Sequence, residues 1–316
     1  MRMPAPSSLP SRRVFPPTGD VASALRFVPP PPDLRAWLDG GVVVQGDAQL
    51  RATRFPAQVG SMLVVRVAGA VHGSAGASGV ACDGAHALLP RAAFIGAATQ
   101  ATQYLHAGAV HAVGLLVRPE AVPALLRASA APVVDTRVAL ADALGGGWTW
   151  LEDAVCDAHD DDARLARLFA AVRAAVTGDV HASRLAALHR MRAAIERLPV
   201  PDAADALGIG ARQFERRFRD AFGMGPKQFQ VIARLQRALH AVAPAQRAPR
   251  HGVPGHGAPG QGAHLAADHG YFDQAHLARD VRRLAGAPLG RLRLEAARPG
   301  SEYWPLAIGR SAAALR

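Results

Sequence analysis

The last third of the sequence contains the same pattern twice: a short helix, a tight turn and a longer amphipathic helix. The first copy covers residues 202–222 and turns at Gly208-Ile209-Gly210, and the second covers 265–284 and turns at Gly270. One such spacing is common in Ala-rich helical sequence, whereas two copies in tandem are far less frequent by accident. The repeat therefore predicts an all-α region that contains two helix-turn-helix units.

The two copies also match position by position around their turns. When the turn glycines are aligned, the small Ala204 falls on Ala266, at the place where two helices must approach closely. The second turn is one residue longer, and beyond it Phe214 corresponds to Leu277. These apolar positions predict the buried side of each longer helix.

Further helices are expected on both sides of the first unit. Ser183 is a suitable N-cap for a helix that ends before Pro199, and a longer helix is expected from Lys227 to about Val242. Segment 244–263 carries four prolines and five glycines, which indicates an insert between the two units. We assign 183–293 to the helix-turn-helix domain and 294–316 to a C-terminal tail.

The first half of the chain has a different pattern. Residues 1–20 are rich in proline and are expected to be a flexible lead-in, and 21–150 alternates short β-branched runs with glycine-rich turns. Segment 151–182 is interpreted as a helical connector in which Asp160-Asp161-Asp162 caps a helix start. The expected fold class is α+β with two domains, a mainly β, sensor-like N-terminal domain and an all-α C-terminal domain.

Charge divides the chain at the same place. Residues 1–182 hold 15 arginines and 15 acidic residues, whereas 183–316 hold 21 basic and 10 acidic residues, so the net charge of +11 lies wholly in the second part. A neutral part joined to a basic part is typical of a sensor or assembly domain attached to a domain that binds a polyanion.

Composition and motifs exclude several other classes. No apolar run is long enough for a membrane span, and Met1–Arg13 lacks the apolar stretch of a signal peptide, so a cytoplasmic protein with no membrane partner is expected. The sequence has no catalytic triad, phosphate loop or dinucleotide fingerprint, so we expect no enzyme and no cofactor. Two distant cysteines and histidines without telling spacing indicate no metal site.

The second copy of the repeat resembles a known family. Its residues Gly270-Tyr271-Phe272-Asp273-Gln274-Ala275-His276-Leu277-Ala278-Arg279, followed by Ala285-Gly286-Ala287-Pro288, closely resemble the signature of the AraC/XylS family of bacterial transcription regulators. Gln213-Phe214-Glu215-Arg216-Arg217-Phe218 is similar to the corresponding part of the first unit. The resemblance implies a sequence-specific regulator of transcription that binds duplex DNA through both units.

The resemblance also implies roles for individual residues. The residues expected to read base edges are Arg212, Glu215 and Arg216 in the first unit and Gln274, Ala275, Ala278 and Arg279 in the second. Those expected to cap helices or to position the DNA are Gly210, Arg219, Lys227, Asp273 and His276. Arginine pairs with guanine, glutamine with adenine and glutamate with cytosine, while alanine packs on the thymine methyl group, so the residue types suit this role.

Further partners follow from the same resemblance: a small-molecule effector or a homodimer contact at the N-terminal domain, and RNA polymerase. Two alternatives stay open. The chain could be an enzyme or small-molecule-binding protein with a vestigial module, because Val281 stands where the family has an aromatic residue and Gly262 where it has an apolar one. It could also bind DNA without sequence preference, which would give a steep salt dependence.

Overall fold

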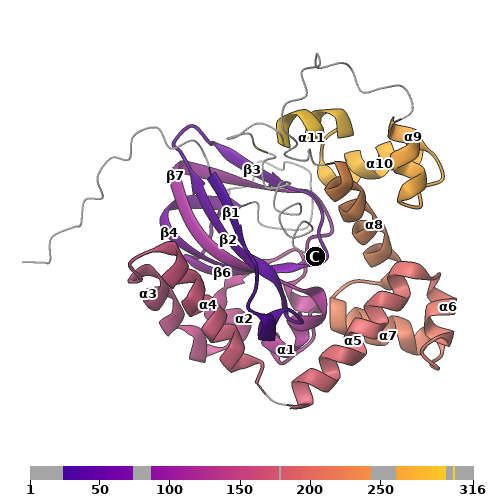
Figure 1. The fold of residues 1–316 in the computed structure, drawn as a ribbon, viewed down its shortest axis with the longest axis horizontal. Coiled ribbons are helices and arrows are strands. Elements are labelled where there is room, and N and C mark those ends of the chain that lie inside the picture. Colours follow the sequence, from indigo (N-terminus) through magenta and orange to yellow (C-terminus); the bar gives the residue numbers. More distant parts are fainter. Residues whose placement is uncertain (1–23, 74–86, 178, 243–260, 297–301, 303–316) are drawn as a thin grey trace, which may run out of the picture.

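The computed structural model describes residues 24–73, 87–177, 179–242, 261–296 and 302. An N-terminal region built on an antiparallel sheet is followed by a helical C-terminal region, so the expected two-domain α+β class is confirmed. Figure 1 shows the sheet on the left and the C-terminal helices on the right. The expected lead-in and most of the insert lie outside the described residues.

The described strands form one antiparallel sheet. They are β1 (Ala24–Val28), β2 (Leu38–Gly46), β3 (Ala52–Phe55), β4 (Ser61–Gly73), β5 (Ala87–Leu88), β6 (Ala92–Ile95), β7 (Thr102–Val117) and β8 (Arg137–Ala139). The order is β1-β2-β7-β4-β6-β8, with β3 paired to β7 and β5 paired to β4. Because β7 pairs with β3 near its start and with β2 near its end, the sheet curves along this long strand (Figure 1).

Alternate side chains of the strands enter two different environments. On β4, Leu63 and Val65 belong to a large core shared with helices, whereas Met62 and Val64 belong to a smaller cluster on the opposite face. This alternation follows from the two-residue period of a strand. One face of the sheet is therefore covered by helices, and the other is free to form a pocket.

Short helices follow the strands and cover the first face. They are η1 (Pro32–Leu34), η2 (Pro119–Ala121), α1 (Val122–Leu126), η3 (Ala131–Val133), α2 (Leu140–Leu144), η4 (Gly146–Trp148), α3 (Trp150–Cys156) and α4 (Asp161–Ala175). Segment 151–182, which was interpreted as a connector, contributes to the core of the sheet domain instead. Leu165 and Val172 of α4 pack in one cluster with Leu63 and Leu115 of the sheet, because the apolar side of α4 needs a partner to bury it.

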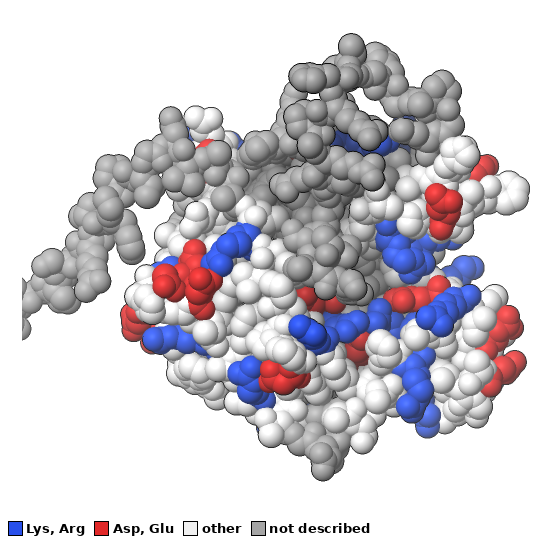
Figure 2. All heavy atoms as spheres, viewed as in Figure 1, with Lys and Arg blue, Asp and Glu red and all other residues white. Residues whose placement is uncertain are grey.

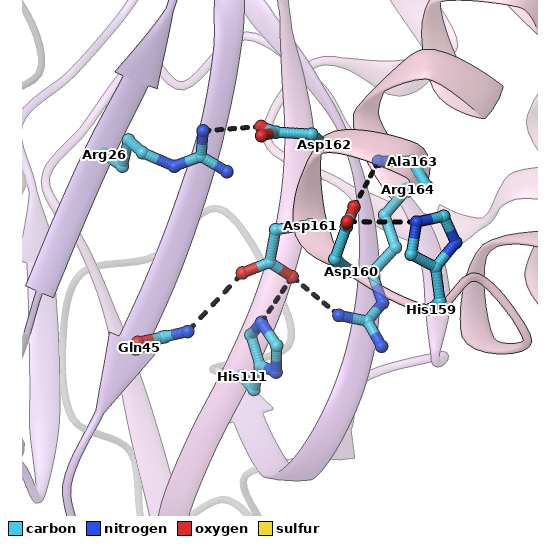
Figure 3. A network of polar contacts seen from close by, with 9 residues as sticks. All are labelled: Arg26, Gln45, His111, His159, Asp160, Asp161, Asp162, Ala163 and Arg164. Atoms are coloured by element: carbon cyan, nitrogen blue, oxygen red, sulfur yellow. Dashed lines mark hydrogen bonds and ion pairs between the residues drawn. The ribbon is translucent and has the colours of Figure 1, made fainter.

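A polar network attaches the start of α4 to the sheet (Figure 3). Asp160 is the N-cap, and its Oδ1 accepts a hydrogen bond from the Ala163 N–H at 2.8 Å. Asp161 Oδ1 lies 2.9 Å from His111 Nε2 of β7 and 2.7 Å from Arg164 NH1. His111 thus has a structural partner in α4.

The C-terminal domain consists of α5 (Asp179–Arg197), α6 (Val200–Asp205), α7 (Ala211–Phe222), α8 (Pro226–Val242), α9 (Gln261–Asp268), α10 (Gln274–Ala285) and α11 (Leu289–Ala296). Two expected helix starts are wrong. Ser183 is not an N-cap, because α5 begins four residues earlier, at Asp179. Helix α9 begins at Gln261, inside the segment 244–263 that was expected to be an insert, so the helix includes the last three residues of that segment.

Aromatic side chains fill the core of the first unit. Phe214, Phe218 and Phe222 lie on one side of α7, and all three are buried. The rings of Phe218 and Phe229 meet edge to face, with centroids 5.2 Å apart, and this contact packs α7 against α8.

None of the described helices combines the length and the apolar character that a membrane span requires.

Candidate nucleic-acid interface

The two turns have the same backbone geometry. Gly208 and Gly270 have φ values of +67° and +70°, which the left-handed region allows to glycine without strain. One residue later, Ile209 N–H donates to Ala204 O at 3.1 Å, and Tyr271 N–H donates to Ala266 O at 2.8 Å. The alignment of the two copies is therefore confirmed in three dimensions, and both units are helix-turn-helix motifs.

The two longer helices, which we call the recognition helices, also end in the same way. Gly223 closes α7 with φ +74°, and Gly286 closes α10 with φ +73°. Their N–H groups donate to Arg219 O at 2.8 Å and to Arg282 O at 3.1 Å. Glycine in the left-handed region is the usual C-cap of a helix. The recognition helices α7 and α10 thus have equal lengths of 12 residues.

The solvent side of α7 carries the residues expected to read DNA. Arg212, Glu215, Arg216 and Arg219 are all exposed. None of them forms an ion pair within the described part of the chain. Gly210 is the N-cap, with φ −65° and ψ 148° and no side chain to accept a bond, so the first N–H groups of α7 are left to solvent or a ligand.

The solvent side of α10 is more varied. Gln274, Ala275 and Arg279 are exposed, whereas Ala278 is half-buried. Asp273 is the N-cap, and its Oδ1 accepts a hydrogen bond from the His276 N–H at 2.6 Å. The four expected base-reading residues of the second unit therefore lie near the start of a capped helix, with three of them accessible.

Basic side chains gather over the helical region at the right of Figure 2, with acidic side chains at its outer edge. Lys227, the second residue of α8, is exposed and forms no ion pair among the described residues. In the sheet region of the same view, basic and acidic side chains are mixed. The charge difference between the two halves of the sequence is thus visible on the surface.

A cluster around Arg234 joins α8 to the second unit, and sequence reasoning did not assign it. Arg234 NH2 lies 3.2 Å from Asp280 Oδ2, and its guanidinium lies 4.2 Å from the centre of the Tyr271 ring. His276 Nε2 lies 3.4 Å from the same NH2 group, so its ring faces this cluster. Arg283 NH2 also lies 2.9 Å from Asp280 Oδ1. The only signal in the sequence was an acidic residue, Asp280, within an otherwise basic helix.

The sheet domain contacts the C-terminal ends of both recognition helices. Ala130 N–H donates to Asp220 O of α7 at 3.0 Å, and Ala57 N–H donates to Leu284 O of α10 at 2.7 Å. Val59 N–H donates to Gln236 Oε1 of α8 at 3.2 Å. We call residues 57–59 the strap, because they connect the sheet domain to the second unit and to α8.

A buried carboxylate marks a further contact between the domains. The Glu120 side chain of η2 is fully buried, and its Oε2 lies 3.1 Å from Arg192 Nε of α5. His189 Nδ1 lies 3.2 Å from Glu120 Oε1, and Arg118 Nε lies 3.4 Å from the same atom. Removing one partner of a buried ion pair is costly, so this cluster orients α5 on the sheet domain.

The face of the sheet away from the helices forms a pocket of about 110 Å³, which we call the sheet pocket. Its wall is mostly apolar, with Val42, Met62, Val64 and Ile95 among the lining residues. Gln58, the middle residue of the strap, lines it too. The pocket is therefore adjacent to the segment that contacts the second helix-turn-helix unit.

One polar group of this pocket, His106, has a partner within the fold through one of its two ring nitrogens. His106 Nε2 lies 3.1 Å from Thr53 Oγ1, and burial lowers the pKa of His106. Its ring is therefore neutral at physiological pH. No group of three or more His, Cys, Asp or Glu side chains that could hold a metal occurs among the described residues, which leave out Cys82, His86, His251 and His256.

No protein-family model matches the chain, and no curated protein matches it. Among solved structures, a crystal structure of ToxT from Vibrio cholerae O395 is similar with a TM-score of 0.41 and 5% identity, and the match covers 82% of this chain and 98% of that one. The crystal structure of an apo ToxT variant from Vibrio cholerae, with one lysine replaced by alanine, gives a TM-score of 0.43 and 8% identity, with 80% and 97% covered.

Proposed function

We propose that this protein is a transcription regulator of the AraC/XylS type that binds duplex DNA in a sequence-specific manner. The observation that carries the proposal is the duplication of geometry: two recognition helices of equal length, with matching turns and caps, each present exposed polar side chains without ion-pair partners in the described chain. If the exposed face of α7 had only a structural role, a second helix-turn-helix unit with the same turn geometry would not be expected.

The exposed residues supply chemistry that suits base edges. Arg216 and Arg279 can each donate two hydrogen bonds to guanine, and Gln274 can pair with adenine. The uncapped N-terminus of α7 at Gly210, together with Arg219 and Lys227, can hold phosphate groups. Helix α8 would keep the two recognition helices about 34 Å apart, which is one turn of DNA.

The contacts between the domains support control by the sheet domain. Because that domain holds the C-terminal ends of both α7 and α10, a change at the sheet would alter the relative orientation of the two recognition helices. The strap would transmit such a change from the sheet domain to the C-terminal domain, since Gln58 lines the pocket while its neighbours Ala57 and Val59 contact the C-terminal domain. Homodimer formation and contact with RNA polymerase remain predictions of the family resemblance.

Selection of bound duplexes from a random pool with the full chain tests the proposal. Enrichment of a defined sequence is expected, and Arg216→Ala and Arg279→Ala should each cost about 1–3 kcal/mol on the selected site. Arg184→Ala removes the same charge from the exposed side of α5, outside both units, and should at most weaken all duplexes equally.

Two results would contradict the proposal. Equal affinity for selected and random duplexes, with a steep salt dependence, would indicate a non-specific DNA binder. Absence of binding at low salt, in a chain that is folded by circular dichroism, would indicate a vestigial module. The buried position of Val281, which is 0% exposed, and of Leu277 at 1% argues against the vestigial alternative, because the apolar side of the second unit is buried in a core that it shares with the first unit.

A further inference from the structure

The turn of the second helix-turn-helix unit contains one residue that the first turn lacks. Ile209 and Tyr271 occupy the same place in the two turns, since each donates its N–H to the carbonyl of an alanine in the preceding helix. The N-caps of the two recognition helices are Gly210 and Asp273. Phe272 stands between Tyr271 and Asp273 and has no counterpart in the first turn. The second turn therefore adds a phenylalanine directly before its recognition helix.

The side chain of Phe272 is almost completely exposed. Its exposed fraction of 93% is the largest among the large hydrophobic side chains that the structure describes. Turns are usually formed by glycine, asparagine, aspartate or serine, and phenylalanine contributes to stability mainly when it is buried. Phe272 does not belong to the core that its neighbour Tyr271 joins. Packing within the protein therefore does not explain this side chain.

The fold holds the backbone of Phe272 in place through both of its neighbours. Tyr271 is buried, and its ring lies 4.2 Å from the guanidinium of Arg234. Asp273 has an extended backbone, with φ −152° and ψ 174°, and its side chain caps α10 through the N–H of His276. Because both flanking residues have fixed partners, a contact made by the Phe272 ring would cost little backbone entropy.

Phe272 also lies beside the residues that are proposed to read bases. Gln274 and Ala275, the first two residues of α10, are exposed in the same way. A recognition helix enters the major groove with its N-terminal residues towards the base edges. The carboxylate of Asp273 already caps the start of α10, whereas Gly210 leaves the start of α7 open to a phosphate group. The start of the second recognition helix is therefore better suited to contact bases than phosphates.

We infer that Phe272 is a specificity-determining residue of the second unit, and that its ring packs against the C5 methyl group of a thymine in the major groove. The inference rests on the proposed function. The thymine methyl group is the apolar group that base pairs present in this groove, and phenylalanine is among the residues that recognise it. A ring without hydrogen-bonding groups distinguishes thymine from the other bases through this methyl group.

The test removes the methyl group from the DNA and the ring from the protein. The full chain and Phe272→Ala each select bound duplexes from a random pool, and one thymine preference should disappear in the variant while the other preferences persist. Uracil, which lacks only the methyl group, then replaces that thymine in the selected duplex, and affinities are measured by fluorescence anisotropy. The wild type should bind the uracil duplex about fourfold more weakly, as expected for one buried methyl group, and Phe272→Ala should bind both duplexes equally.

Two further variants separate this contact from a general loss of apolar surface. Leu294→Ala removes another exposed apolar side chain, from α11 of the same domain, and should leave the selected sequence and the uracil effect unchanged. Phe272→Leu keeps an apolar side chain and should keep part of the uracil effect. Thermal unfolding of Phe272→Ala should match that of the wild type, since the ring buries almost none of its surface.

Three results would overturn the inference and leave the proposed function intact. They are an unchanged selected sequence for Phe272→Ala, equal binding of the thymine and uracil duplexes by the wild type, and a loss of affinity in Phe272→Ala that is equal on selected and random duplexes. The last result would indicate a contact with sugar or phosphate, which carries no sequence information. A chain that selects no sequence at all would contradict the proposed function and this inference with it.

Discussion

The backbone carbonyl of Asp220, near the end of the first recognition helix, accepts a hydrogen bond from the N–H of Ala130 in the sheet domain at 3.0 Å. Ser129 Oγ donates to the same carbonyl at 3.0 Å. A helix leaves its last carbonyls without intrahelical partners, so the sheet domain supplies the partners that this helix lacks. The orientation of α7 is thereby coupled to the position of the sheet domain.

Gly223→Ala should loosen this contact, and Gly286→Ala serves as its matched control. Both glycines have positive φ, so both substitutions should lower the free energy of unfolding by about 1 kcal/mol. A Cβ on Gly223 would also collide with Val134 and Ala130 of the sheet domain, whereas at Gly286 it would meet only Ala101 at 3.3 Å. Limited proteolysis between the domains should be faster only for Gly223→Ala. Equal rates for the two variants would show that the contact does not hold the domains together.

Gly262→Ala should alter base reading through Gln274. A Cβ on Gly262 would lie 2.6 Å from Gln274 Nε2, the far end of a flexible side chain, so the amide should move rather than the backbone. Alanine also favours the helix, so stability should rise by up to about 1 kcal/mol. Sequence selection should show a changed preference at one base position, and in a Gln274→Ala background the substitution at 262 should have no such effect.

Arg234→Ala should destabilise the second unit. The change leaves Asp280, whose side chain is 9% exposed, with fewer partners, and the expected cost is about 1–3 kcal/mol in the free energy of unfolding. Arg237→Ala removes an exposed arginine from the same helix and should cost much less. Hydrogen exchange should increase in α9 and α10 but not in α6 and α7. Uniform exchange across both units would contradict the local role of Arg234.

Acidification should destabilise the sheet domain through His106. Burial lowers the pKa of this ring in the folded state, whereas the unfolded ring takes up a proton below about pH 6.5. The unfolded state therefore binds more protons, and stability should be full above that pH and fall as the pH decreases from 6.5 towards 5. Chemical unfolding of His106→Gln over this range should show a shallower pH dependence than the wild type. Identical slopes would contradict this assignment.

Deletion of residues 247–256 should leave DNA affinity and footprint nearly unchanged. The contacts that hold the second unit to α8 come from Arg234, Asp280 and Tyr271, none of which belongs to this segment. Shortening a loop changes its closure free energy by only about 0.6 kcal/mol per halving. A deleted chain that folds normally by circular dichroism yet loses DNA binding would show that the segment positions the second unit or contacts DNA.

The sequence by itself determined the features that depend on local backbone geometry. Glycine at 208 and 270 predicted the tight turns, and periodic apolar residues such as Phe214 and Leu277 predicted the buried sides of the recognition helices. Each signal lies within a few residues of the structure it specifies, because turns, caps and helix faces are set by short-range sterics and hydrogen bonds. The repeat of these signals then predicted the fold of the C-terminal domain.

Only the tertiary structure determined which distant segments of the chain are in contact. The packing of α4 on the sheet and the contact between Ala57 and Leu284 both join residues that no sequence period relates. The residues involved, such as this alanine and this leucine, have no distinctive local pattern. Their roles arise from burial and proximity, which the chain acquires only when its two domains pack together.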